Sequence, residues 1–322
     1  MRFLLLAFLL IPVPTPLFAV DGILLHRKSI VRFATNQEGK DILAKDDAFI
    51  SRLSHFDRQS RMKTNDEVTN DDFIKFITRE IVEWEKDEMD KVSVAVNSIR
   101  KKMDAFQIPF PKTILLIKTT GKEEGEAAYC RSHAVVLPQK VLGRPPDSLE
   151  RLLIHELFHI LSRHDTELRT KLYAIVGFHP CDEIKLPKSL RDRRITNPDA
   201  PSIDYYIELK VKGMLTKAVP VLYSSAKEYD AKQGGSFFKY LLFRMMIVKK
   251  NGDQWSAVER DGRPIVFDPM KLPAYFEKIG NNTGYIIHPD EILADNFVHL
   301  VRRTEDLKTP RIVDEMSKLL AK

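Results

Sequence analysis

The sequence predicts an α+β fold, in which helical and strand-forming stretches occupy mostly separate parts of the chain. Apolar residues recur at helical spacing over residues 70–106. Residues 113–117 form an unbroken apolar run of the length typical of a buried strand. Later, short apolar runs are separated by Asn251-Gly252 and Asp261-Gly262, and these dipeptides are strong hairpin signals. We therefore expect helices early in the chain and a β-rich region in its second half.

Composition places the chain among ordinary globular proteins, with 43% apolar and 30% charged residues. Its 322 residues are enough for one large core or two modest ones. The net charge of +6 is spread along the chain, and no basic cluster is interleaved with aromatic residues. We therefore expect no nucleic-acid partner. The oligomeric state is left open.

The first 19 residues have the layout of a secretory signal peptide. Met1-Arg2 is a short positive start, residues 3–11 are an unbroken apolar run, and the small residue Ala19 ends the stretch. The apolar run is too short to span a bilayer as a mature helix. We expect cleavage after Ala19 and a periplasmic or secreted protein with no stable membrane span.

Residues 20–110 are expected to form an N-terminal helical region. One amphipathic helix is predicted over 41–60. A long second helix would be capped by Asn70 or Asp71 and end before Pro109. Its apolar stripe is interpreted as core.

A strand and a third helix follow the first buried strand. Residues 127–137 read as a second strand closed by Pro138. Asp147 and Glu150 have the spacing of a capping box, which predicts a helix start. That helix would run to about residue 176, with or without a break.

Two histidines and a glutamate are the polar residues in the middle of this helix. His155, Glu156 and His159 form H-E-x-x-H, and every other residue over 152–161 is apolar. Positions i and i+4 share one helix face, so both imidazoles can reach one Zn²⁺ ion. Glu156 could then take a proton from a zinc-bound water. The alternative is a pair of core histidines, whose burial without partners would be costly.

This helix resembles the active-site helix of the zincin metallopeptidases. In that family the strand before the helix is an edge strand that pairs with extended substrate. The resemblance implies that residues 127–136 are a substrate-binding edge, and main-chain pairing is a general way to hold a peptide.

A third zinc ligand is expected near the C-terminus. Pro289 and the acids behind it indicate a helix start, and Glu291 and Asp295 share one face of that helix. They resemble the E-x-x-x-D/E motif of gluzincins and the E-x-x-A-E/D-x-F form of anthrax lethal-factor-like zincins. The match implies that Glu291 is the third ligand and that Asp295 orients a ligand histidine. The alternative is a solvated acidic first turn.

Two other carboxylates compete with Glu291. Asp165 stands where a few related families place a ligand, but Ser162 holds the place of the glycine at which the helix would turn. Asp290 lacks an acidic partner four residues on. Tyr285 is a candidate donor to the oxyanion of the transition state, with Tyr205 and Tyr206 as further candidates.

The long separation of the two motifs implies a zincin-like catalytic region over 111–322 with a β-rich insertion at about 203–268. Within it, residues 237–248 fit a strand or a helix equally well. Cys130 and Cys181 flank the active-site helix and could form a disulfide or remain separate thiols.

The expected function is an exported zinc metallopeptidase that acts on protein or peptide substrates. Two rivals remain. One is a non-catalytic exported binding or envelope-assembly protein built on a zincin-like core, and the other is a metal-dependent amidase that acts on cell-wall peptides.

Overall fold

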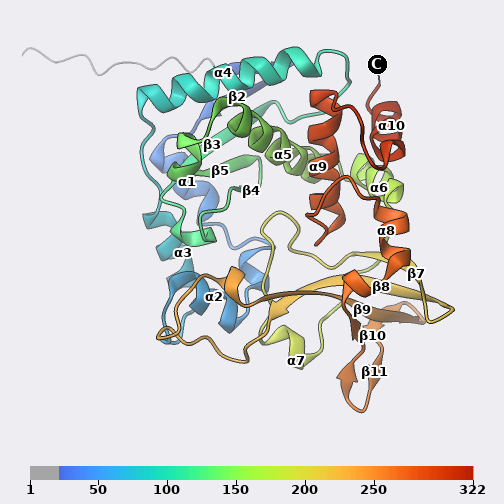
Figure 1. Ribbon diagram of the computed structural model, residues 1–322. Coiled ribbons are helices and arrows are strands. Elements are labelled where there is room, and N and C mark those ends of the chain that lie inside the picture. The colour runs from blue at the N-terminus through green and yellow to red at the C-terminus, as the bar shows by residue number, and fades with distance from the viewer. Residues whose placement is uncertain (1–21, 322) are drawn as a thin grey trace, which may run out of the picture.

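The computed structural model describes residues 22–321, so the predicted signal peptide lies outside the described part. The chain forms two lobes, with a helix-rich upper lobe around one sheet and a lower lobe around a second sheet (Figure 1). This mixed architecture confirms the α+β class. No helix within residues 22–321 combines the length and the apolar character of a membrane span.

The upper sheet has five strands in the order β1-β2-β3-β5-β4. Strands β2, β3 and β5 run parallel, whereas β1 and β4 are antiparallel to their neighbours. The strands are β1 (Ile23–His26), β2 (Ser29–Phe33), β3 (Thr113–Thr119), β4 (Tyr129–Arg131) and β5 (Ala134–Pro138). Strand β4 is therefore an edge strand, and it is in contact with the helix that carries H-E-x-x-H.

Helices cover both faces of this sheet. Side chains of β3 alternate between two apolar clusters, as the pleat requires: Ile114 and Leu116 belong to one, Leu115 and Ile117 to the other. The first cluster contains residues of the fourth and fifth helices, the second residues of the first and third. These helices are α1 (Asn36–Leu43), α2 (His55–Met62), α3 (Asn70–Arg79), α4 (Lys86–Met103) and α5 (Pro146–His164).

The N-terminal region differs from the all-helical prediction. Strands β1 and β2 join the same sheet as β3, so residues 20–110 are not purely helical. The helix predicted over 41–60 is broken into α1, a 3₁₀ turn and α2, because Ser54 caps a new helix start. The long helix over 70–106 is broken between α3 and α4. There Ile81 forms a bridge to Thr119, and the Trp84 indole N–H donates to the Leu116 carbonyl.

The helix that carries H-E-x-x-H forms as predicted, but its start is different. Pro145 occupies the N-cap position without a side-chain hydrogen bond. The predicted capping box is wrong, because Asp147 pairs with Arg302 and Glu150 binds Ser98 instead. A break does occur after His164, and α6 (Thr166–Ile175) continues the chain.

The strand predicted over 127–137 is a hairpin of two strands, β4 and β5. Its turn contains Ser132, whose φ of 55° lies in the left-handed region. The hairpin makes β4 short and places it at the sheet edge beside α5, with which it is in contact.

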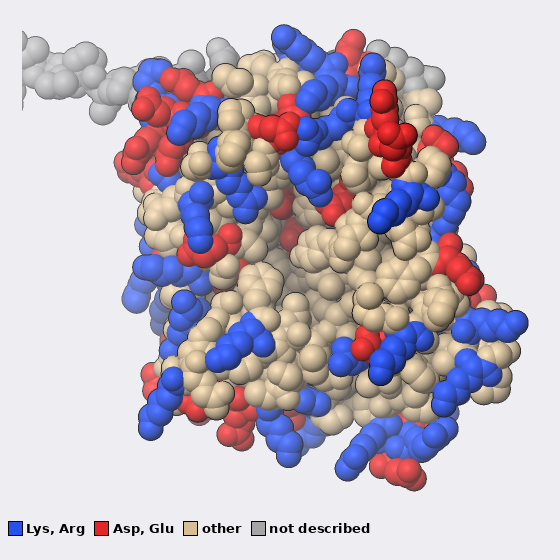
Figure 2. Space-filling view, viewed as in Figure 1, with Lys and Arg blue, Asp and Glu red and all other residues tan. Residues whose placement is uncertain are grey.

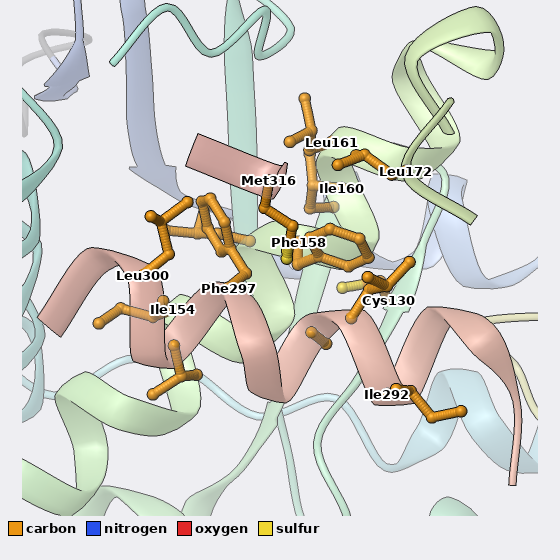
Figure 3. Packing of buried hydrophobic residues seen from close by; sticks show 14 of the residues in the cluster. Cys130, Ile154, Phe158, Ile160, Leu161, Leu172, Ile292, Phe297, Leu300 and Met316 are labelled. Atoms are coloured by element: carbon orange, nitrogen blue, oxygen red, sulfur yellow. The ribbon is translucent and has the colours of Figure 1, made fainter. Parts of the chain in front are cut away.

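Two long helices pack against each other in the upper lobe and form the framework of the candidate site. Helix α9 (Pro289–Arg302) lies beside α5, and α10 (Pro310–Leu319) covers α9 (Figure 1). Phe158 of α5 and Phe297 of α9 meet with ring centroids 5.7 Å apart. Figure 3 shows these rings among other buried apolar side chains, including Ile154 and Leu300.

The lower lobe is an antiparallel sheet with a central order β10-β9-β8-β7-β6. The ambiguous stretch 237–248 is a 3₁₀ turn followed by a strand, and both predicted hairpins form, with Gly252 and Gly262 at positive φ. The strands are β6 (Phe178–Pro180), β7 (Tyr205–Val211), β8 (Met214–Ser224), β9 (Leu241–Asn251), β10 (Gln254–Ala257), β11 (Glu259–Arg260), β12 (Arg263–Pro264) and β13 (Val266–Phe267). Two short helices, α7 (Lys188–Arg191) and α8 (Pro273–Ile279), flank it.

Candidate metal centre

Helices α5 and α9 bring three potential metal ligands to one point. His155 and His159 lie one turn apart on α5, and Glu291 lies in the first turn of α9. One ligand atom from each residue lies within 4.8 Å of the other two. The Nε2 atoms of His155 and His159 are 3.2 Å and 3.5 Å from the same Glu291 oxygen, Oε2. The structure thus places together the three residues that the sequence predicts as ligands.

Asp295 holds the first histidine. The Nδ1 atom of His155 lies 3.2 Å from Asp295 Oδ1, and Arg151 donates to the same oxygen over 3.0 Å. Thr283 donates its hydroxyl to the second oxygen of Asp295. This carboxylate therefore fixes the ring so that Nε2 faces Glu291.

Asp290 holds the second histidine, a role that the sequence did not indicate. Its Oδ2 atom lies 2.7 Å from His159 Nδ1, and the Tyr173 hydroxyl donates to Oδ1 over 2.7 Å. All three side chains are buried. Asp290, the carboxylate that competed with Glu291, therefore lies outside the ligand cluster and supports a histidine from behind.

Asp165, the other competing carboxylate, does not reach the site. It is the N-cap of α6, and its Oδ1 accepts from the Leu168 backbone N–H over 2.9 Å. The helix break that follows His164 uses this cap rather than a turn toward the histidines.

The electrostatics of the three candidate ligands favour a positive charge between them. Although burial lowers it, hydrogen bonds to Asp295 and Glu291 raise the pKa of His155 to about 9. Burial opposes ionisation of Glu291, but His159 and His155 hold the pKa of its carboxyl well below its usual range. Ionisation of this buried carboxyl beside two imidazoles favours a positive charge close to it. A divalent cation would supply it with neutral imidazoles.

Glu156 lies beside this cluster and is also buried. The Cys130 thiol donates to Glu156 Oε2 over 3.4 Å. Burial raises the pKa of the Glu156 carboxyl, an effect that His159 and His155 partly offset. Cys130 and Cys181 are free thiols, so the disulfide alternative is not realised.

A cavity of about 310 Å³ opens onto these residues. Figure 2 shows the hollow between the lobes, with acidic side chains inside it. Its lining combines helix α5, the residues just before β4 and the first two turns of α9. It comprises Ala127, Ala128, Arg144, Ser148, Arg151, Leu152, His155, Glu156, His159, Asp199, Tyr285, Glu291 and Asp295.

Tyr285 is the tyrosine that the structure places in this cavity. Its ring stacks on His155 with centroids 6.0 Å apart, and 41% of the residue is exposed. The charge of Glu291, together with burial, raises the pKa of the hydroxyl, which keeps it a neutral donor. Tyr205 instead lines a second cavity and shares a hydrogen bond with Thr170. Tyr206 stacks against Trp255 in the lower lobe.

Two residues of the site come from the proline-rich stretch 179–202, where the sequence gives no sign of a site residue. Asn197 donates its amide to Glu291 Oε1 over 2.6 Å. Asp199 Oδ1 accepts from the Cys130 backbone N–H over 2.7 Å, and its carboxylate lies within 4.8 Å of Glu156 and of the Cys130 sulfur. Neighbouring prolines predict a loop but not its destination, so no local signal identified these residues.

Comparisons with models of known families, with curated proteins and with solved structures gave no match to this chain. The resemblance to zincins therefore stays a prediction that rests on the two motifs.

Proposed function

We propose that this chain is an exported zinc-dependent peptidase that hydrolyses peptide bonds in protein or peptide substrates. The observation that carries the proposal is the convergence of His155, His159 and Glu291, with Glu156 beside them in one cavity. Two imidazole nitrogens and one carboxylate are a donor set that suits catalytic zinc. When bound, zinc would lower the pKa of a water molecule and polarise the substrate carbonyl. Export is supported by the sequence of residues 1–19.

Glu156 is the general base of this proposal. Its carboxylate would take a proton from the attacking water and deliver it to the leaving nitrogen. Burial raises the pKa of the carboxyl, which makes it a better acceptor, and the Cys130 thiol holds one of its oxygens. Tyr285, stacked on His155 at the cavity wall, would donate to the developing oxyanion.

Asp295 and Asp290 would act as positioning residues. Each accepts from the Nδ1 side of one histidine, so each fixes a tautomer whose Nε2 is free to bind a metal. Such carboxylates also raise the basicity of the imidazole. The site therefore needs little rearrangement before it can bind metal.

Zinc stoichiometry of the mature protein, measured by elemental analysis, tests the proposal. We expect about one zinc per chain in the wild type and a large loss in Glu291→Ala, because two histidines alone rarely hold zinc. Asp165→Asn is the matched control: it removes the other candidate charge, keeps the cap of α6 and should retain zinc.

A peptide library then tests catalysis, with Glu156→Gln as the zinc-loaded inactive control. We expect the wild type to hydrolyse peptides and the variant to be slower by roughly 10²- to 10⁴-fold. A wild type that binds no supplied zinc would favour the non-catalytic binding protein. Zinc binding with cleavage of cell-wall peptides alone would favour the amidase.

A further inference from the structure

One side of the metal cavity is closed by the segment 196–201, which reaches up from the lower lobe toward β4 and α9 (Figure 1). Asn197 binds the ligand Glu291, and Asp199 binds the backbone N–H of Cys130. Asp199 lines the metal cavity on one side and a second cavity of about 370 Å³ on the other. The segment thus separates two hollows that would otherwise adjoin.

The segment is anchored in buried contacts. The Thr196 backbone N–H donates to Asp57 over 2.8 Å, and its carbonyl accepts from Arg61 over 3.0 Å. Asp57, Arg61 and Thr196 are almost fully buried. If the segment moved away, Asp57 and Arg61 would stay buried but lose a hydrogen-bond partner each, which is costly. The segment therefore stays in place and closes this side of the cavity.

Arg163 of α5 clamps the end of the segment nearest the cavity. Its guanidinium donates to the carbonyls of Pro198 and Asp199, each over 3.1 Å. Pro198 and Pro201 further restrict the backbone. The backbone of Asp199 is therefore held by Arg163, while one carboxylate oxygen accepts from Cys130 and the other is left for a ligand.

The wall also occupies the edge of the sheet. In β4, Tyr129 and Arg131 flank Cys130, whose N–H points away from β5 to the Asp199 carboxylate. An extended substrate that ran the length of this edge would need that N–H. The substrate chain must therefore end near Asp199 instead of continuing past it.

Charge identifies which end of a peptide fits there. Four carboxylates line the cavity, and Asp295 among them is paired with Arg151. The other three, Glu156, Glu291 and Asp199, carry one more negative charge than a divalent metal neutralises when all three are ionised. A free α-amino group carries the one positive charge that remains. The lining also contains Arg144, just before α5, which suits the carboxyl-terminal side of a short peptide.

We infer that the enzyme is an aminopeptidase and that Asp199 binds the α-ammonium group of its substrate; this rests on the proposed peptidase function. The α-nitrogen lies about 2.5 Å from the first carbonyl carbon. Asp199 and Glu156 lie within 4.8 Å of each other, so one can hold the amine while the other serves that carbonyl. Water adds across the first peptide bond: its hydroxyl joins the carbonyl carbon and its proton goes to the leaving nitrogen. The products are a free amino acid and a shortened peptide.

Binding to zinc-loaded Glu156→Gln protein tests this inference without turnover. The probes are the peptide Ala-Leu-Ala-Ala and its N-acetylated form, titrated by calorimetry. We expect the free amine to improve affinity about 10- to 100-fold, as for one charged hydrogen bond. Adding Asp199→Asn should bring the ratio near one, because the amide still accepts from Cys130 but carries no charge.

Asp204→Asn is the matched control for that variant. Asp204 lies in the same part of the chain but lines the second cavity, so the preference for the free amine should survive its loss. Zinc content and thermal melting of Asp199→Asn should match the parent protein, which separates loss of the charge from loss of the fold.

Turnover distinguishes failure of this inference from failure of the proposed function. Wild-type release of the first residue from free peptides, but not from acetylated ones, supports the inference. Internal cleavage of acetylated peptides at a similar rate overturns it while the peptidase function stands. Faster cleavage of acetylated peptides by Asp199→Asn also overturns it and identifies the segment as a displaceable latch. A zinc-loaded wild type that binds and cleaves neither form overturns both.

Discussion

The two walls of the candidate metal cavity are built in different ways. The wall made by α5 and α9 carries its polar residues at helical spacing, so each helix presents its set as a unit: His155 and His159 on one, Glu291 and Asp295 on the other. The wall made by the segment 196–201 has no regular structure and is held by hydrogen bonds to distant elements. A rigid pair of helices suits metal binding, whereas an anchored loop suits discrimination between substrates.

The largest effect is expected from removing a ligand on the helical wall. His159→Ala should abolish zinc binding and activity, because only Glu291 and His155 would remain as ligands and Asp290 would lose its histidine partner. Elemental analysis measures the loss. His164→Ala, an exposed histidine at the end of the same helix, should keep full zinc. Equal zinc in both variants would contradict the proposed ligand set.

The next effect concerns the anchor of the loop wall. Arg61→Met should lower the free energy of unfolding by about 3–5 kcal/mol, because Asp57 and Glu124 would remain buried without their cation. Urea denaturation measures the change, and zinc content should persist in the folded fraction. Lys63→Met, at an exposed position after the same helix, should change stability by less than about 0.5 kcal/mol. A similar change in the free energy of unfolding of both variants would show that the buried ion pairs of Arg61 do not stabilise the fold.

A third prediction concerns the pH dependence of stability and the buried carboxyl of Glu123, which precedes Glu124 of that anchor in the sequence. Burial raises the pKa of Glu123 to about 7 in the folded protein, although the Thr119 hydroxyl opposes the shift. The unfolded carboxyl ionises first, so stability falls as pH rises from its ordinary pKa of 4.5 to about 7 and then levels off. The loss should be about 2–3 kcal/mol.

Urea denaturation of wild type and Glu123→Gln at pH 5 and pH 8 measures this change in the free energy of unfolding. Glu123→Gln should remove that part of the pH dependence and be the more stable protein at pH 8. An identical pH profile for the two proteins would refute the raised pKa.

The smallest effect comes from trimming the support behind a ligand. Tyr173→Phe removes the hydroxyl that donates to Asp290 while keeping the ring, so it should cost about 1 kcal/mol of stability. Zinc affinity should fall by a few-fold to about tenfold, because Asp290 orients His159 less firmly. Competition with a chelator measures the affinity. Tyr206→Phe, which alters a tyrosine of the lower lobe, should leave zinc affinity unchanged.

Sequence alone determined those features that depend on near neighbours. The 3.6-residue period places His155 and His159 on one face, and the same reasoning pairs Glu291 with Asp295. Asn251-Gly252 predicts its hairpin because glycine adopts positive φ without strain. Each of these inferences uses residues no more than a few positions apart, so the chain itself contains the needed information.

Tertiary structure decided the features that depend on distant partners. The break between α3 and α4 occurs because Ile81 pairs with a strand far along the chain, a partner that periodicity cannot reveal. Asp290 could be a ligand or a support until packing of α5 on α9 sets which atom of His159 it meets. Asp199 enters the cavity because hydrogen bonds with three separate elements, β4, α5 and α2, hold its loop there. Local preference specifies helices and turns, whereas the partners of a loop are chosen only when the whole chain has packed.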